Sequence, residues 1–420
     1  PVHLSLPVDI MFSSFEADAG KNERPWTRNQ VAPQRAWPEP ARLSEILKII
    51  ENSERPLIIG GHGVWWSRSE KSLAEVGEKL LIPIFNVPYH TKLLGEDCTA
   101  NMGLADFHQY HPSKAAIHEA DTIIMIGGRL DNQMNFGNPP FIPKNTKLIC
   151  INGSSEELEY NFSADEILLS HPAAFLEAMK SIGRTWKNWF EIQIDRRKKW
   201  VEDWEKHLFE EASKDAKLKR KMHPLQLGVD IISEMNDDDW LVFDGGNTHF
   251  WNEIAVNMSG WRGKKLGGIM HPGNYSLLGV GISFGISAKA AHPDKNVIVI
   301  SGDGAFLSGG LSVESAFQEG LPIVVVIDNN GGLDCISQQQ ERLFSNGKHY
   351  ATDFRDIPFH TMFEGLGGYG ELVTSRDELI PALARAINSG KTACLNVKCR
   401  GVISPIVAAT SDKRDKASIE

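Results

Sequence analysis

The chain has 420 residues, of which 41% are hydrophobic and 23% charged, and its formal net charge is −10. A protein of this length has room for two or three domains, each with its own core. The acidic balance argues against a nucleic-acid or membrane-surface partner, and no apolar run approaches the roughly 18 residues of a membrane helix. Five scattered cysteines without zinc spacing, and no visible signal peptide, favour a reduced, cytoplasmic setting.

The first forty residues carry little regular pattern. The opening run PVHLSLPVDI, residues 1–10, alternates apolar and polar side chains over its first six positions, which predicts a half-buried strand. Residues 11–40 are rich in Pro, Asn, Arg and Ala and show no sustained period, so we expect an irregular linker there.

Residues 41–183 show a regular alternation of helical and strand patterns. The expected helices are 43–51, 69–80 and 113–119, and the expected strands are 57–60, 83–87, 122–127, 148–152 and 167–169. Strands separated by helices of this length predict a parallel sheet with right-handed crossovers. This segment is therefore expected to be a doubly wound α/β domain.

Two glycine-bearing turns follow strands of this first domain. Their backbone N–H groups, at 60–63 and 127–128, could approach a phosphate, and the planar guanidinium of Arg129 could pair with one. Packing turns beside a surface arginine would explain the same residues equally well. Neither turn completes a G-x-G-x-x-G motif with a following acidic residue, which argues against a nicotinamide-dependent oxidoreductase.

Residues 184–222 predict a long amphipathic helix followed by a charged connector. Its apolar stripe consists of Trp186, Trp189, Phe190, Trp200, Trp204 and Leu208 at helical spacing. Gln193 and Arg197 interrupt the stripe. A linker helix packed between domains explains this pattern better than an aromatic cofactor site does.

Residues 223–400 predict a second doubly wound α/β domain, followed by a polar tail at 401–420. The expected helices are 224–235, 280–291, 311–319 and 376–388, and the expected strands are 240–244, 297–300, 323–327, 367–373 and 394–398. The fold class is thus α/β, with two doubly wound parallel-sheet domains.

Polar clusters follow two strands of the second domain. Asp303 lies between two glycines after the strand 297–300, and Asn330 follows the strand 323–327. Neighbouring parallel strands present their carboxyl ends at one edge, so these side chains could meet there. Carboxylate and amide oxygens suit Mg²⁺, which takes its remaining ligands from phosphates and water. We therefore predict a diphosphate held through a metal, with ordinary turns as the alternative.

The motif GDG at 302–304, followed by NN at 329–330, resembles the cofactor motif of thiamine-diphosphate-dependent enzymes. The resemblance implies that Asp303, the side chain of Asn330 and the backbone carbonyl of Gly332 bind Mg²⁺, which holds the diphosphate. The further cofactor-binding residues that it implies are Asn247, Thr248, Ser276, Leu278, Gly302, Gly304, Ala305 and Leu333.

Two turns are assigned through this resemblance. Asn247 and Thr248 match a diphosphate-contacting G-x-N-T sequence, although both residue types also suit a helix N-cap. Leu278 takes the place of the bulky apolar residue that bends the cofactor, and Ser276 would offer its carbonyl to the pyrimidine amino group. The histidines at 249 and 271 could reach a substrate, but a lone loop histidine is more often incidental.

The run GDGAFLSGGLSVE is similar to oxalyl-CoA decarboxylases and 2-hydroxyacyl-CoA lyases, including the distance to Glu314. We expect cleavage or formation of a C–C bond next to a carbonyl in a 2-oxo acid or 2-hydroxyacyl substrate, with the thiazolium ring of the cofactor accepting electrons. The alternatives are an acetolactate-synthase-like transferase that condenses 2-oxo acids and a non-catalytic subunit of the same fold. The loop after Asn330 departs from the family patterns and leaves the substrate open.

The first domain resembles the family's middle domain. Its run GGRLDNQMNFGNPP is similar to the version that binds ADP or the CoA nucleotide, with Arg129 matching the arginine of that motif. Residues 101–104 replace the glycine/histidine loop that acetolactate synthases use for FAD, so the resemblance favours ADP or CoA over FAD.

The opening run also resembles the sequence that closes the family's amino-terminal pyrimidine-binding domain. We therefore interpret residues 1–10 as the last strand of a domain otherwise absent from this sequence. In the family that domain supplies the activating glutamate, so the catalytic residues stay unassigned. We expect these 420 residues to bind the cofactor weakly and to need a pyrimidine-binding domain, in cis or in trans, for turnover. The resemblance also implies a homodimer or homotetramer.

Overall fold

A computed structural model of the chain describes residues 4–14, 35–87, 93–106, 110–158, 161, 163–218, 221–273, 276–344 and 348–409. The chain divides into two compact units, Pro1–Arg35 and Ala36–Glu420. Most of the predicted linker at 11–40 and most of the tail at 401–420 lie outside the described residues. Among the described residues, no helix combines the length and apolar character needed to cross a membrane.

The predicted strand at the start of the chain is wrong over its described part. Residues 4–7 have no regular structure, and α1 (Val8–Met11) is a short, exposed helix. A strand must satisfy its backbone N–H and C=O groups on a neighbour, and neither sheet described below includes this segment. Alternation of side chains alone does not show whether a segment has a neighbouring strand.

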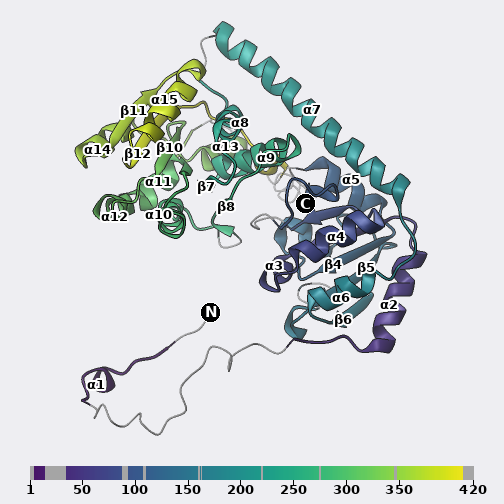
Figure 1. Cartoon of the computed structure of the whole chain (residues 1–420). Helices are drawn as coiled ribbons and strands as arrows, with labels where there is room; N and C mark the ends of the chain where they lie inside the picture. The colour runs from purple at the N-terminus through teal and green to yellow at the C-terminus, as the bar shows by residue number, and fades with distance from the viewer. Residues whose placement is uncertain are drawn as a thin grey trace. The chain divides into compact units, whose positions relative to one another are not determined.

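The middle part of the chain forms the first predicted α/β domain around a six-stranded sheet (Figure 1). Its strands are β1 (Pro56–Gly60), β2 (Ile84–Asn86), β3 (Asn101–Leu104), β4 (Thr122–Ile126), β5 (Lys147–Asn152) and β6 (Glu166–Leu169). All pair in parallel, in the order β3-β2-β1-β4-β5-β6. Its helices are α2 (Pro40–Asn52), α3 (His62–Trp66), α4 (Glu70–Leu80), α5 (His111–Glu119) and α6 (Pro172–Met179), with 3-10 turns η3 (Asn132–Gly137) and η4 (Ser155–Glu157). Burial of every residue of β1 and β4 explains their unbroken apolar runs.

The second domain has its own six-stranded parallel sheet, in the order β11-β12-β10-β9-β7-β8. Its strands are β7 (Trp240–Asp244), β8 (Gly268–Met270), β9 (Val297–Gly302), β10 (Val324–Asn329), β11 (Tyr369–Val373) and β12 (Ala393–Lys398). The chain leaves β7 toward β8 and returns to β9 on the other side of β7. The topological switch point therefore lies between β7 and β9, which is where open α/β sheets bind ligands.

Helices cover both faces of this second sheet. They are α8 (Pro224–Glu234), α9 (Asn247–Trp261), α10 (Gly281–Ala291), α11 (Asp303–Gly309), η6 (Gly310–Val313), α12 (Glu314–Gln318), α13 (Asp334–Leu343), α14 (Phe359–Gly365) and α15 (Arg376–Asn388). One face packs against α8, α9 and α15, and the other against α10, α11, α12 and α14. The two doubly wound α/β domains are confirmed.

The linker helix α7 (Lys187–Leu218) is the long teal helix in Figure 1. Its apolar stripe is buried apart from Trp204, which is partly buried, and the two polar interruptions are buried too. Gln193 is 1% exposed and Arg197 is 5% exposed. The guanidinium of Arg197 donates to the carbonyl of Asn101 and lies 5.2 Å from the ring centre of Trp261. These polar residues therefore form part of the packing surface.

A polar contact links the end of α7 to the end of β12. The guanidinium of Arg400 pairs with the carboxylates of Glu211 and Asp215. Hydrogen bonds from Lys214 and Arg400 lower the pKa of Glu211 to about 2. A carboxylate whose pKa is lower in the folded than in the unfolded chain stabilises the fold at pH values above its unfolded pKa. This stabilisation is lost as pH falls from about 4.5 toward 2.

We expect Glu211→Gln to lower the free energy of unfolding at pH 7 by about 1 kcal/mol, since the ion pair is only partly buried. Urea unfolding at pH 7 and pH 3 measures the difference, which is expected to shrink at the lower pH. Glu202→Gln, at an exposed carboxylate on the same helix, is the control. Equal destabilisation by both variants at both pH values would contradict this prediction.

Candidate functional site

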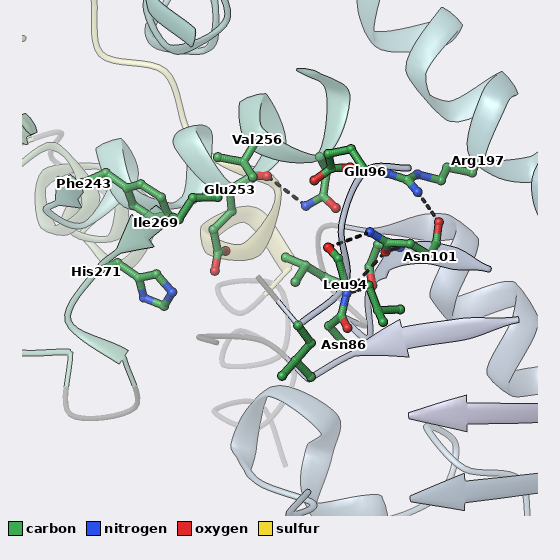
Figure 2. A pocket seen from close by; sticks show the side chains of 14 residues that line it. Asn86, Leu94, Glu96, Asn101, Arg197, Phe243, Glu253, Val256, Ile269 and His271 are labelled. Carbon is green, nitrogen blue, oxygen red and sulfur yellow. Dashed lines mark hydrogen bonds and ion pairs between the residues drawn. The ribbon is translucent and has the colours of Figure 1, made fainter. Parts of the chain in front are cut away.

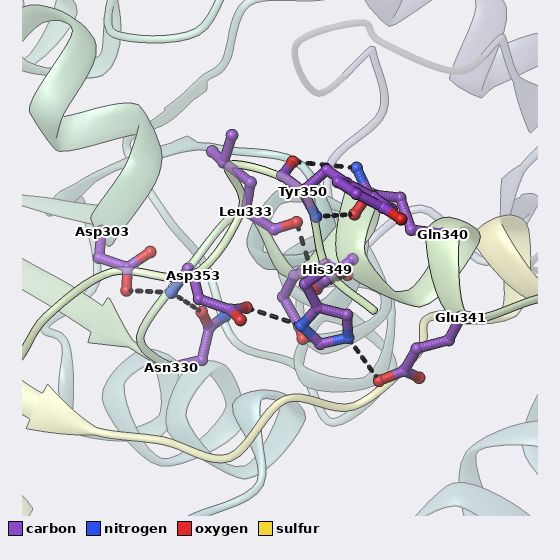
Figure 3. Close-up of polar contacts among 11 residues, drawn as sticks. Asp303, Asn330, Leu333, Gln340, Glu341, His349, Tyr350 and Asp353 are labelled. Atoms are coloured by element: carbon purple, nitrogen blue, oxygen red, sulfur yellow. Dashed lines mark hydrogen bonds and ion pairs between the residues drawn. The ribbon is translucent and has the colours of Figure 1, made fainter. Parts of the chain in front are cut away.

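The carboxyl ends of β9 and β10 bring the predicted metal-binding residues together. Gly302, the last residue of β9, pairs with Asp328 of β10. The N–H of Gly332 donates to Oδ2 of Asp303 at 3.1 Å and to Oδ1 of Asn330 at 3.2 Å (Figure 3). One backbone group thus contacts both side chains, and the predicted meeting of Asp303 and Asn330 at one sheet edge is confirmed.

The carboxylate of Asp303 is buried in a shell of backbone N–H groups. Its Oδ2 also accepts from Gly331 at 2.8 Å, and its Oδ1 accepts from Gly304 at 2.7 Å. Burial, together with the charge of Asp328, raises the pKa of Asp303 to about 7 against the lowering effect of these hydrogen bonds. A buried carboxylate disfavoured in its charged form is stabilised by a nearby cation.

The oxygen donors at this edge suit a hard divalent cation. They are one carboxylate, one amide and the carbonyl of Gly332, which is the ligand chemistry that Mg²⁺ prefers. Among the described residues, no group of three or more His, Cys, Asp or Glu side chains could hold a metal. A metal at this edge would therefore complete its coordination with phosphate or water oxygens.

The local backbone needs its glycines. Gly331 has φ of +92°, which L side chains rarely adopt. A Cβ on Gly332 would lie 2.4 Å from the carbonyl oxygen of Thr352, and one on Gly304 would lie 2.5 Å from Cδ2 of Leu333. The predicted contact residues Gly304 and Leu333 therefore touch each other beside Asp303.

Asn247 and Thr248 begin α9 at the end of β7. The N-cap is Gly246, so the alternative reading of these two residues as N-caps is wrong. The side chain of Asn247 donates to Oε1 of Gln338 at 2.9 Å and accepts from Oγ of Ser404 at 2.9 Å. Because the side chains are occupied in this way, the N–H groups of the first helical turn are the better candidates for a phosphate contact.

The loop that carries Ser276 and Leu278 is anchored to the same sheet edge. Oδ2 of Asp244 accepts from the N–H groups of Gly279 at 2.9 Å and Gly281 at 2.7 Å. Ser276 has φ of +49°, and Leu278 is 39% exposed beside this anchor. The loop thus presents an apolar side chain from a fixed backbone, as the predicted bend of the cofactor requires.

Two buried carboxylates at this edge were not predicted. Asp244 ends β7, and Asp328 lies within β10, where it accepts from Oγ1 of Thr248 at 2.8 Å. The thiol of Cys399 also interacts with Asp328, and burial raises the pKa of both carboxylates. Asp328 was detectable in the sequence, since it lies in the strand directly after the apolar run VVVI. The partners of Asp244 lie too far along the chain to be recognised from local sequence.

The two histidines considered for substrate contact lie in a separate polar cluster. Nε2 of His249 is 3.3 Å from Oε1 of Glu253, and the ring of Phe243 stacks on His271. His271 and Glu253 line a cavity of about 70 Å³ (Figure 2), which holds only a few water molecules. The predicted cofactor-binding residues are not among those that line it.

The glycine turns of the first domain pack against each other at its switch point. A Cβ on Gly61 would lie 2.3 Å from the Cα of Gly128. Both Nε and Nη2 of Arg129 donate to the carboxylate of Glu157. Close packing therefore explains why both turns contain glycines. A nucleotide contact by Arg129 stays a prediction.

Two parallel-sheet domains, one with a cluster of oxygen ligands beside its switch point, define a doubly wound α/β protein. Residues 43–179 match the family described as "Thiamine pyrophosphate enzyme, central domain". Residues 246–397 match "Thiamine pyrophosphate enzyme, C-terminal TPP binding domain". The chain therefore belongs to the thiamine pyrophosphate enzyme family.

Relatives with three different activities resemble the chain. A 2-hydroxyacyl-CoA lyase of Arabidopsis thaliana is 26% identical, covering 98% of this chain and 70% of its own length. The acetolactate synthase large subunit of Mycobacterium tuberculosis is 27% identical, and the match covers 94% of this chain and 69% of the relative. The oxalyl-CoA decarboxylase of Escherichia coli is 25% identical, and the match covers 98% of this chain and 69% of the relative. A rice 2-hydroxyacyl-CoA lyase is 26% identical, and the match spans 63% of its length.

Proposed function

We propose that the chain binds thiamine diphosphate through Mg²⁺ at the edge formed by β7, β9 and β10. The observation that carries this proposal is the single N–H of Gly332 that contacts both Asp303 and Asn330. These two side chains and the carbonyl of Gly332 would hold the metal. The cofactor, when bound, supplies a carbon nucleophile and an electron sink for breaking or forming a C–C bond.

The chain's own residues bind and orient the cofactor in this proposal. The first turn of α9 directs N–H groups toward the diphosphate, and its positive helix end favours that charge. Asp244 fixes the loop that presents Leu278, which would set the bend between the two rings. A cation would compensate for the cost of burying the charge of the Asp303 carboxylate.

The reaction that we propose is cleavage or formation of a C–C bond next to a carbonyl, in a 2-hydroxyacyl or 2-oxo acid substrate. Similarity to a 2-hydroxyacyl-CoA lyase and an oxalyl-CoA decarboxylase supports this class. Similarity to an acetolactate synthase supports a second candidate, the condensation of 2-oxo acids. A pyrimidine-binding domain, in cis or in trans, would supply the activating carboxylate.

Calorimetric titration of the chain with thiamine diphosphate, with and without Mg²⁺, tests the binding proposal. We expect a saturable heat that needs the metal. Adding a separately produced pyrimidine-binding domain of a relative is then expected to permit turnover of a 2-hydroxyacyl-CoA or a 2-oxo acid. Absence of metal-dependent heat, even with that domain supplied, would favour a non-catalytic subunit.

A further inference from the structure

A short segment after α13 lies against the proposed metal turn. We name residues 348–354 the strap. The N–H of Leu333 donates to the carbonyl of Thr352 at 2.7 Å, and the N–H of Phe354 donates to the carbonyl of Gly331 at 2.8 Å. Backbone hydrogen bonds therefore join the strap to Gly331 and Leu333, the residues on either side of position 332.

That residue is Gly332, whose carbonyl is a proposed metal ligand. Gly332 and Asp353 form an isolated antiparallel bridge. The carbonyl oxygen of Thr352 lies only 2.4 Å from the position that a Cβ on Gly332 would take. The position of Gly332 thus depends directly on where the strap lies.

Side chains hold the other end of the strap on α13. Nδ1 of His349 is 2.7 Å from Oδ1 of Asp353, and its Nε2 is 2.8 Å from Oε1 of Glu341 (Figure 3). The amide of Gln340 accepts from the N–H of Tyr350 at 2.7 Å and donates to its carbonyl at 3.2 Å. One imidazole and one amide thus connect the strap to the helix.

The charges around the imidazole favour its protonated form. The hydrogen bonds that the ring makes to the carboxylates of Asp353 and Glu341 raise the pKa of His349, and Asp334 at the start of α13 also interacts electrostatically with the ring. When protonated, both ring nitrogens donate, one to each carboxylate. Of the residues of α13, only Ser337 is buried, so polar contacts of this kind largely determine where the helix lies.

We infer that His349 is a positioning residue. By joining Glu341 of α13 to Asp353 of the strap, it keeps the strap on the turn and the carbonyl of Gly332 directed for a cation. The inference rests on the proposed function in one respect, because the cation whose affinity depends on the position of Gly332 is the proposed Mg²⁺.

The test compares the full chain with His349→Ala, His349→Gln and a control, His118→Ala, at an exposed histidine on α5. Hydrogen exchange without ligand follows the amides of Leu333 and Phe354, and calorimetry then titrates Mg²⁺ at saturating thiamine diphosphate. We expect His349→Ala to speed exchange at both amides. We also expect it to weaken Mg²⁺ binding about three- to tenfold, since each partly exposed ion pair contributes up to roughly fivefold.

The remaining variants separate positioning from general damage. His349→Gln retains one amide donor and is expected to recover part of the Mg²⁺ affinity, while exchange in β9 and β10 stays at the wild-type rate in both variants. Unchanged exchange at Leu333 and Phe354, or unchanged Mg²⁺ affinity despite faster exchange, would overturn the inference. Absence of Mg²⁺ heat in the wild type rejects the proposed function, and the exchange rates still decide whether His349 holds the turn.

Discussion

Asp303→Ala is expected to lower the Mg²⁺-dependent affinity for thiamine diphosphate at least about 100-fold. The side chain is 2% exposed and supplies the negative charge of the proposed ligand set. Its loss also removes the acceptor of the N–H groups of Gly331 and Gly332. Breaking a buried charge pair costs about 3–5 kcal/mol, and each 1.4 kcal/mol is a factor of ten. Calorimetric titration of the full chain measures the affinity.

Two further variants make this experiment specific. Asp303→Asn keeps an oxygen that can accept from the turn and removes the charge, so its loss of affinity reports the charge alone. Asp237→Ala removes an exposed aspartate and is expected to bind as the wild type does. Wild-type affinity in Asp303→Ala would place the metal elsewhere.

Gly61→Ala is expected to destabilise the first domain by at least about 3 kcal/mol. The added Cβ would lie 2.3 Å from the Cα of Gly128 and 2.6 Å from the carbonyl oxygen of Gly127. Both atoms belong to the backbone, so they cannot move aside as a flexible side chain can. Overpacking of this kind typically costs 1–3 kcal/mol, and more where the backbone itself must shift. The midpoint of thermal unfolding measures the loss.

A matched substitution elsewhere in the chain controls for the effect of replacing a glycine. A Cβ on Gly183 would meet no heavy atom within 4 Å. Gly183→Ala is therefore expected to leave the unfolding midpoint unchanged or to raise it slightly, because alanine restricts the unfolded chain more than glycine does. Equal midpoints for both variants would mean that the two turns can separate without cost.

The sheets were predictable where strands are long and β-branched. Runs such as VIVI and VVVI are buried on both faces and carry a strong local signal. The strands β3 and β8 were missed because NMGL and GIM are short and contain little of that signal. The helix α13 was expected to be a loop, since the sequence GGLD before it indicates a turn and its apolar content is low.

The site was predictable only where its geometry follows from strand ends. Asp303 and Asn330 meet because each directly follows one of two neighbouring parallel strands, and sequence pattern predicts such neighbours. The contact of Asp353 with Gly332 joins residues far apart in the chain and follows no period. Asp244 likewise meets glycines of a distant loop. Contacts of this kind depend on the folded arrangement rather than on local sequence.

The hydrogen bond from Ser404 to Asn247 affects the order in which contacts can form while the chain is being synthesised. Asn247 begins α9 early in the second domain, while its partner emerges from the ribosome after every strand of that sheet. The indole of Trp251 on the same helix donates to the carbonyl of Val402, which emerges equally late. A nascent chain can therefore form both sheets before the N-terminal end of α9, the proposed phosphate-binding end, makes its last contacts. The contacts that hold the first turns of α9 are therefore completed only after the last strand of the sheet has been synthesised.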